Sequence, residues 1–272
     1  MAAENAHAPS GSEYIVHHLT NLTHGEGATA LHLDSVFFSV LLAVVFVGFF
    51  ALVARRATAG VPGKLQLFVE VLVEFVDTQV RDTFHGTSKL VAPLALTIFC
   101  WVLLFNFMDL VPVDLLPKTG ELFGIHYLKV VPSTDPNITI GMSLTVFLLC
   151  MFYSVKIKGA WGFAKELLTH PFGPWMAPFN LLLNFIEHLA RPVSLGLRLY
   201  GNLYAGEMIF LLIAVLGGSF GLASLGGVGA IFGQLVLGTV WGLFHILVVP
   251  LQAFIFMVLT VVYLAQAHET HH

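Results

Sequence analysis

Long runs without a charged residue constrain this chain more than any other feature of its sequence. Residues 35–54, 90–108 and 136–155 contain no Asp, Glu, Lys or Arg, and neither does the much longer stretch 208–268. A helix needs about 20 residues to cross the roughly 30 Å of hydrocarbon in a bilayer. The runs are continuously apolar and show no alternation, so helices are expected to satisfy the backbone. The pattern predicts an all-α polytopic membrane protein.

The composition excludes other classes of protein. Hydrophobic residues make up 57% of the 272 residues and charged residues only 10%, whereas soluble domains carry about 25% charged residues. Twelve Lys and Arg against sixteen Asp and Glu leave no basic surplus for phosphates, which excludes a nucleic-acid binder. Cys100 and Cys150 lie in apolar runs without metal-type spacing, and neither a metal nor a cofactor is expected. We expect a single membrane domain over residues 1–272.

The last apolar stretch is too long for one crossing. Residues 178–267 contain two apolar segments separated by a glycine-rich patch between Gly217 and Gly229, which is expected to be a loop. The second segment would be roughly 60 Å long as a helix, about twice the hydrocarbon thickness. We therefore expect a hairpin of two long, strongly tilted helices in addition to three near-perpendicular spans. The competing interpretation is a set of perpendicular spans broken at Pro192 and Pro250.

The distribution of Lys and Arg predicts how the chain is oriented. No Lys or Arg precedes Arg55, basic residues follow the first and third spans, and few occur between residues 109 and 135. The N-terminal segment 1–34 is therefore expected outside and the C-terminus in the cytoplasm. Residues 62–85 carry charged and apolar side chains at helical spacing, which predicts an amphipathic interfacial helix on the cytoplasmic side.

The predicted hairpin contains ionisable side chains, although a charge in hydrocarbon costs at least about 2.5 kcal/mol. At about 100° per residue, six polar residues share one face of its first helix. They are Asn184, Glu187, Arg191, Ser194, Arg198 and Asn202. Glu207 lies nine residues after Arg198 and is expected on the opposite side. On the second helix, Gln234, His245 and Gln252 share one face.

Structural explanations exist for several of these residues. Glu187 and Arg191 would pair one turn apart near the interface, and Asn184 and Ser194 would satisfy neighbouring backbone groups. Arg198 fits such an explanation least, because a guanidinium stays protonated and this one lies too deep in its helix to reach the surface easily.

The arrangement of these groups suits ion movement. A permanent cation at Arg198, with the titratable groups Glu207 and His245 on neighbouring positions of the hairpin, is typical of a path for protons. The chain contains no GxxxxGK[ST] loop for a nucleotide. The energy for transport must therefore come from an ion gradient or from a partner.

Two long motifs in the hairpin resemble subunit a of F-type ATP synthases. The first runs from Pro192 to Glu207 and reads PVSLGLRLYGNLYAGE, and the second runs from Phe244 to Thr260 and reads FHILVVPLQAFIFMVLT. The pieces EYIVHHLTNL near the N-terminus and MDLVPVDLLP after the second span are similar as well. The resemblance covers nearly the whole chain and is closest to the proteobacterial form.

The resemblance implies a proton-conducting, non-catalytic stator subunit in the bacterial inner (plasma) membrane. It implies that Arg198 faces the rotating ring of c subunits, with Asn202 and Gln252 as polar neighbours. Glu207 and His245 match the half-channel that opens to the outside. Ser194 matches the half-channel region on the cytoplasmic side. The implied partners are the c-ring, the b subunits, the lipid bilayer and protons.

Two positions depart from the family pattern. Asn184 stands where some relatives carry a glutamate, while Glu187 supplies a carboxylate one turn later, and Pro250 stands where others have a different residue.

Two other classes of protein remain as alternatives. A self-contained ion-coupled transporter usually has repeated halves, which the sequence does not show. A quinone- or haem-binding subunit prefers paired histidines on facing helices, and His245 has no comparable partner.

Overall fold

The computed structural model describes residues 15–16, 19–25, 27, 30–86, 88–111, 115, 129–218 and 225–269. Within these ranges the only strands are β1 (Thr23–His24) and β2 (Leu31–His32), which form a short antiparallel ladder. The remaining elements are helices. They are α2 (Leu33–Arg55), α3 (Lys64–Thr83), α4 (Val91–Met108), α6 (Pro136–Thr169), α7 (Ala177–Gly218) and α8 (Leu225–His268), with the 3-10 turns η2 (Pro132–Thr134) and η3 (Pro174–Met176).

Five of these helices are long and apolar enough to cross a membrane. The exception is α3, whose charged side chains break the apolar surface that the other helices present. On α2, Val40, Val44 and Val47 are all more than half exposed, as expected for a surface that faces acyl chains. The predicted all-α architecture with several candidate spans is therefore confirmed.

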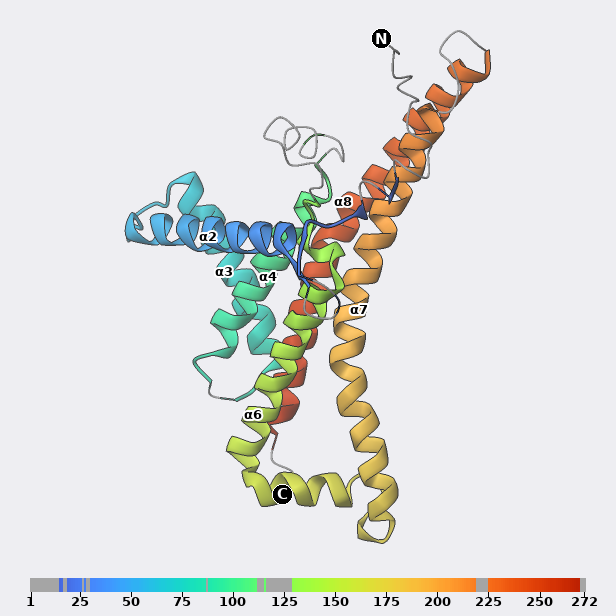
Figure 1. Cartoon of the computed structure of the whole chain (residues 1–272). Helices are drawn as coiled ribbons and strands as arrows, with labels where there is room; N and C mark the ends of the chain where they lie inside the picture. Colours follow the sequence, from blue (N-terminus) through green and yellow to red (C-terminus); the bar gives the residue numbers. More distant parts are fainter. Residues whose placement is uncertain are drawn as a thin grey trace.

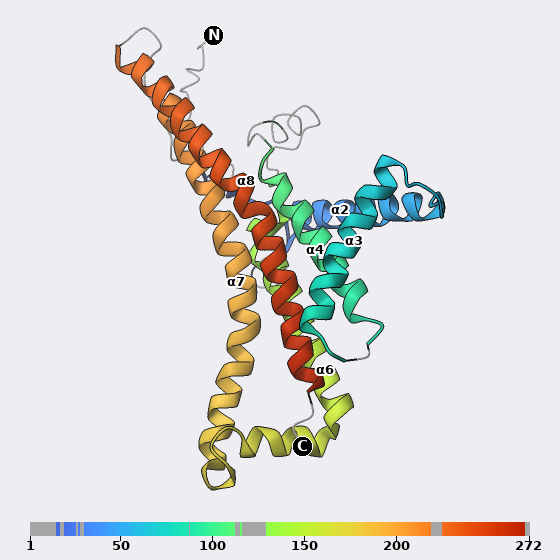
Figure 2. The same ribbon diagram turned by 180° about the vertical axis from the view of Figure 1, so that it is seen from behind.

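Helices α7 and α8 form the long axis of the molecule. They lie side by side over part of their length and diverge towards the end where the chain terminates, while α2 runs across their direction (Figures 1 and 2). Each helix continues through its internal proline, Pro192 in α7 and Pro250 in α8. The interpretation in which the helices break at these prolines does not describe the chain.

The hydrophobic core joins α2, α3, α4, α6, α7 and the C-terminal half of α8. Val102 of α4, Leu199 of α7 and Met257 of α8 are completely buried in it. A close approach of α6 and α7 depends on Gly196, because a Cβ at this position would lie 2.8 Å from Ser143 Oγ. The core thus holds α7 and α8 against the rest of the chain.

Two segments differ from the expectation. The third predicted span, 136–155, continues as α6 to Thr169, with a break at Gly159, whose φ of 73° is readily adopted only by glycine. The glycine-rich patch is partly helical, because Gly226, Gly227 and Gly229 lie within α8, while residues 219–224 lie outside the described residues. A helix in apolar surroundings satisfies its backbone internally, which outweighs the penalty of about 1 kcal/mol for each glycine.

Candidate functional site

The polar stripe of α7 lies on an exposed side of the helix. Ser194, Arg198 and Asn202 are all exposed. Within the part of the chain that the structure describes, the Arg198 guanidinium has no hydrogen bond or ion pair. Asn202 Nδ2 donates to Gln252 Oε1 of α8 at 2.9 Å, and Gln252 is buried. The two helices are therefore joined by a hydrogen bond one turn beyond Arg198.

The beginning of the stripe is satisfied locally, as the structural explanation predicted for Glu187, Arg191 and Asn184. Arg191 donates to Glu187 at 2.5 Å, and its guanidinium lies 5.5 Å from the Tyr263 ring centroid. Asn184 Nδ2 donates to the carbonyls of Leu167 and His170, each at 2.9 Å. Asn184 thereby fastens the end of α6 to α7, while Ser194 makes no such bond among the described residues.

A buried ionisable cluster lies on the other side of α7. Glu207 is only 6% exposed, which agrees with its expected offset from Arg198. Its Oε2 has no hydrogen-bond partner within the described ranges. His245 of α8 is 1% exposed, and its Nε2 lies 2.5 Å from Asp109 Oδ2 at the end of α4. The His245 ring lies against Gly206, the residue directly before Glu207, so the three groups form one cluster.

Gly206 lets the His245 ring lie directly against α7. A Cβ at Gly206 would overlap that ring. The Trp241 indole of α8 donates to the Gly206 carbonyl at 3.3 Å, and the Phe210 ring centroid lies 5.3 Å from that of His245. The histidine is therefore enclosed by α7, by aromatic side chains and by Asp109, which leaves it few orientations.

Sequence analysis missed Asp109 as a partner of His245. The two residues are 136 positions apart, so no local pattern in the sequence pairs them. The available signal was an acidic residue directly after an apolar span, within the motif MDLVPVDLLP.

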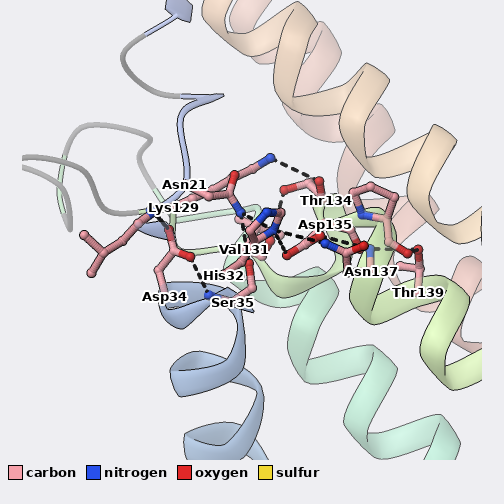
Figure 3. Close-up of polar contacts among 12 residues, drawn as sticks. Asn21, His32, Asp34, Ser35, Lys129, Val131, Thr134, Asp135, Asn137 and Thr139 are labelled. Carbon is pink, nitrogen blue, oxygen red and sulfur yellow. Dashed lines mark hydrogen bonds and ion pairs between the residues drawn. The ribbon is translucent and has the colours of Figure 1, made fainter. Parts of the chain in front are cut away.

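A second set of polar contacts ties α2 to the start of α6 (Figure 3). The Asp34 carboxylate is buried and accepts hydrogen bonds from the backbone N–H groups of Leu22, Ser35 and Lys129. His32 Nδ1 lies 2.6 Å from Asp135 Oδ2. Asp135 also caps α6, because its carboxylate accepts from the Asn137 N–H at 3.0 Å.

A cavity of about 290 Å³ lies where α6, α7 and α8 diverge. Lys158 Nζ lies 2.8 Å from a Glu166 carboxylate oxygen at its wall. Its ionisable lining also includes Glu187, His188, Arg191, Tyr263 and Glu269. The cavity therefore adjoins the end of the stripe that begins with Glu187 and Arg191.

These features define a multi-pass membrane protein that holds an acid–histidine cluster within its apolar helices. The chain belongs to the ATP synthase A chain family, whose family model matches residues 36–265. This finding confirms the resemblance drawn from the two hairpin motifs.

Relatives match over nearly their whole length. "ATP synthase subunit a 1" of Methylococcus capsulatus is 58% identical, and the match covers 100% of both chains. "ATP synthase subunit a" of Shewanella amazonensis is 56% identical over 99% of each chain. "ATP synthase subunit a 1" of Photobacterium profundum is 53% identical over 97% of this chain and 98% of its own.

Proposed function

We propose that this chain is the proton-conducting stator subunit of a bacterial ATP synthase, which couples proton flow to ATP synthesis without catalysing a reaction itself. The observation that carries the proposal is Arg198. Its guanidinium is permanently charged, exposed and unpaired within the described residues, and it lies in a helix apolar enough to cross a membrane. A cation in that position is stabilised by an acid from another chain, which the ring of c subunits supplies.

The outside half-channel runs through the buried cluster. Glu207 and His245 carry protons between the outside and the ring carboxylate, and Asp109 orients the His245 ring through the 2.5 Å contact with Nε2. The free oxygen of Glu207 supports this role, because a buried polar atom without a partner is available to a water molecule or a proton.

The cytoplasmic half-channel uses the other end of the stripe. Ser194 lies about one turn and Glu187 about three turns before Arg198 along the same face of α7, and Glu187 lines the 290 Å³ cavity. Glu187 takes the place of the missing carboxylate at Asn184, whose amide is committed to backbone carbonyls. Protons leave the ring carboxylate towards the cytoplasm by this path.

Arg198 keeps the two half-channels apart. A ring carboxyl that has taken up a proton is neutral and can turn into the lipid, and it ionises again when it returns to the guanidinium from the other side. Asn202 and Gln252 hold the helix surface beside Arg198 through their 2.9 Å hydrogen bond. A proton that falls through about 150 mV releases roughly 3–4 kcal/mol, so several protons are needed for each ATP.

The proposed arrangement in the membrane follows the predicted one. The chain forms a single membrane domain with three near-perpendicular spans, and the tilted hairpin of α7 and α8 lies against the c-ring, which accounts for its excess length. The N-terminus is outside and the C-terminus is in the cytoplasm. The b subunits bind the same domain and complete the stator.

The decisive experiment replaces Arg198. We expect Arg198→Ala to abolish ATP-driven proton pumping by inverted membrane vesicles, while the soluble part of the complex continues to hydrolyse ATP. Arg81→Ala is the matched control, because Arg81 is an exposed arginine on α3 that pairs with Asp77. Normal pumping by the Arg198→Ala complex would refute the proposed function.

A further inference from the structure

The last part of α6 turns away from the direction of the rest of the helix. The first part runs from Pro136 to the break at Gly159, and as a helix it is about 35 Å long. That length is close to the roughly 30 Å of hydrocarbon in a bilayer. The α6 tail, residues 160–169, then runs across the direction of α7 (Figures 1 and 2). The break therefore lies where a span reaches the membrane surface.

The α6 tail has an inner and an outer face. Phe163 and Glu166 lie on the inner face, where they line the 290 Å³ cavity. Trp161, Lys165 and Leu168 share the opposite, outer face, because they follow one another at helical spacing. All three are exposed, and the Trp161 side chain is 84% exposed. The described part of the chain therefore leaves the outer face uncovered.

The tail is held rigidly in this orientation. Across the break, Lys158 Nζ lies 2.8 Å from a Glu166 carboxylate oxygen. The Asn180 side chain of α7 is buried, and its Nδ2 donates to the carbonyls of Leu168 and Gly173 at 3.0 and 2.8 Å. The outer face is thus presented at a fixed place relative to α7.

The tryptophans of the chain fall into two pairs. Of the four, Trp101 and Trp241 donate their indole N–H to backbone carbonyls of the chain. Trp161 on the tail and Trp175 in η3, which is 97% exposed, donate to no group within the described residues. An indole combines a large apolar body with one polar N–H group, which is why tryptophan is enriched at the boundary between membrane and water.

Two lysines without a carboxylate partner accompany these tryptophans. Lys156, in the last turn before the break, and Lys165 on the outer face are both exposed, and neither forms an ion pair among the described residues. Basic side chains next to a membrane are attracted to anionic lipid headgroups. Unpaired lysines and tryptophans at the end of a span therefore complement headgroups in both charge and polarity.

We propose that the outer face of the α6 tail, together with Lys156 and η3, is a binding surface for anionic phospholipid headgroups in the leaflet on the predicted cytoplasmic side. Trp161 and Trp175 lie among the headgroups, and the ammonium groups of Lys156 and Lys165 bind lipid phosphates. The inference needs only a membrane protein with this fold, so it stands apart from the proposed proton path.

The first test locates the two tryptophans by fluorescence, in the complete complex and in the isolated full-length subunit, each reconstituted with brominated lipids. The emission of each tryptophan is the difference between the unmodified protein and Trp161→Phe or Trp175→Phe. We expect bromines near the headgroups to quench this emission more strongly than bromines near the chain ends, and acrylamide in the water to quench it weakly. Trp101→Phe is the matched control, because Trp101 lies in the middle of α4 and should not show this preference.

The second test measures the preference for an anionic lipid. Quenching of the same emission by brominated phosphatidylglycerol is compared with quenching by brominated phosphatidylcholine. We expect Lys156→Gln and Lys165→Gln each to lower the preference about fivefold, which corresponds to about 1 kcal/mol for a lysine near an anionic surface. Lys165→Arg should keep the preference. Lys64→Gln is the matched control, because Lys64 is an exposed lysine at the start of α3.

Several outcomes would overturn the inference. Strong quenching by acrylamide without quenching by brominated lipid would place the outer face in water. Quenching by lipid in the isolated subunit but not in the complete complex would mean that another subunit covers the face, and failure of the Phe or Gln variants to assemble would have the same meaning. An unchanged preference in both Gln variants would show that the surface does not recognise anionic headgroups.

Discussion

Two polar regions lie on different sides of the same helix, and they are satisfied in different ways. In the buried cluster of Glu207, His245 and Asp109, the histidine and Asp109 are partners of each other within the chain. On the exposed stripe of α7, Arg198 has none among the described residues. The comparison shows that buried polar groups bonded to each other are part of the fold. An exposed charged group without a bond in the described chain instead indicates a binding partner on another chain. Variants in the cluster should therefore lose both stability and function, and variants at Arg198 only function.

The largest loss of stability is expected for Asp109→Ala. It leaves His245, 1% exposed, without its carboxylate partner, and breaking a buried pair in this way costs about 3–5 kcal/mol. The measurement is chemical denaturation of the purified subunit in detergent. Asp109→Asn retains a hydrogen-bond acceptor and should lose less. Equal stability of Asp109→Ala and the unmodified chain would mean that the cluster is not part of the fold.

A smaller loss is expected for Gly206→Ala. The new Cβ overlaps the His245 ring, and overpacking of this kind costs about 1–3 kcal/mol. Gly201→Ala is the matched control on the same helix, because a Cβ there meets nothing within 4 Å. Denaturation midpoints of the two variants should move in opposite directions, since alanine favours a helix over glycine by about 1 kcal/mol. Two similar midpoints would contradict the enclosed position of the histidine.

Asn202→Ala should have a still smaller effect on stability. The variant removes the donor to the Gln252 oxygen, and a typical hydrogen bond contributes about 1 kcal/mol. A double-mutant cycle with Gln252→Leu measures the coupling between the two side chains. A coupling energy near zero would show that the contact does not join α7 to α8.

Arg198→Met should leave the free energy of unfolding within about 0.5 kcal/mol of that of the unmodified chain, because no hydrogen bond or ion pair within the described residues is lost. The same variant should abolish proton pumping by the complete complex. A large destabilisation of the isolated subunit would instead show that Arg198 already has a partner within the chain, and the contrast between the two regions would disappear.

The helices and the two sides of α7 could be predicted from the sequence, because both follow from local periodicity. Charge-free runs predicted the long apolar helices, and the nine-residue spacing of Arg198 and Glu207 placed them on different sides. The extension of α6 beyond residue 155 was not predicted, since the glycine that allows its break, Gly159, acts through a backbone angle. The spacing of residues along one helix determines the face on which each residue lies.

The contacts that complete the candidate site could not be predicted in the same way. His245 and Asp109 are 136 positions apart, and His32 and Asp135 are 103 apart. Lys129 and Asp109 both lie in segment 109–135, between two charge-free runs. Their burial depends on how α4, α7 and α8 pack, which no short segment of sequence encodes.

The exposed guanidinium also bears on how the complex is assembled. A newly inserted copy of this subunit carries an uncompensated charge among acyl chains, at a cost of about 2.5–3.5 kcal/mol on insertion scales. That cost is of the same order as a severe core mutation. On the proposed function, that cost is relieved only when the acidic partner binds, so the position of Arg198 favours the assembled complex over the isolated subunit.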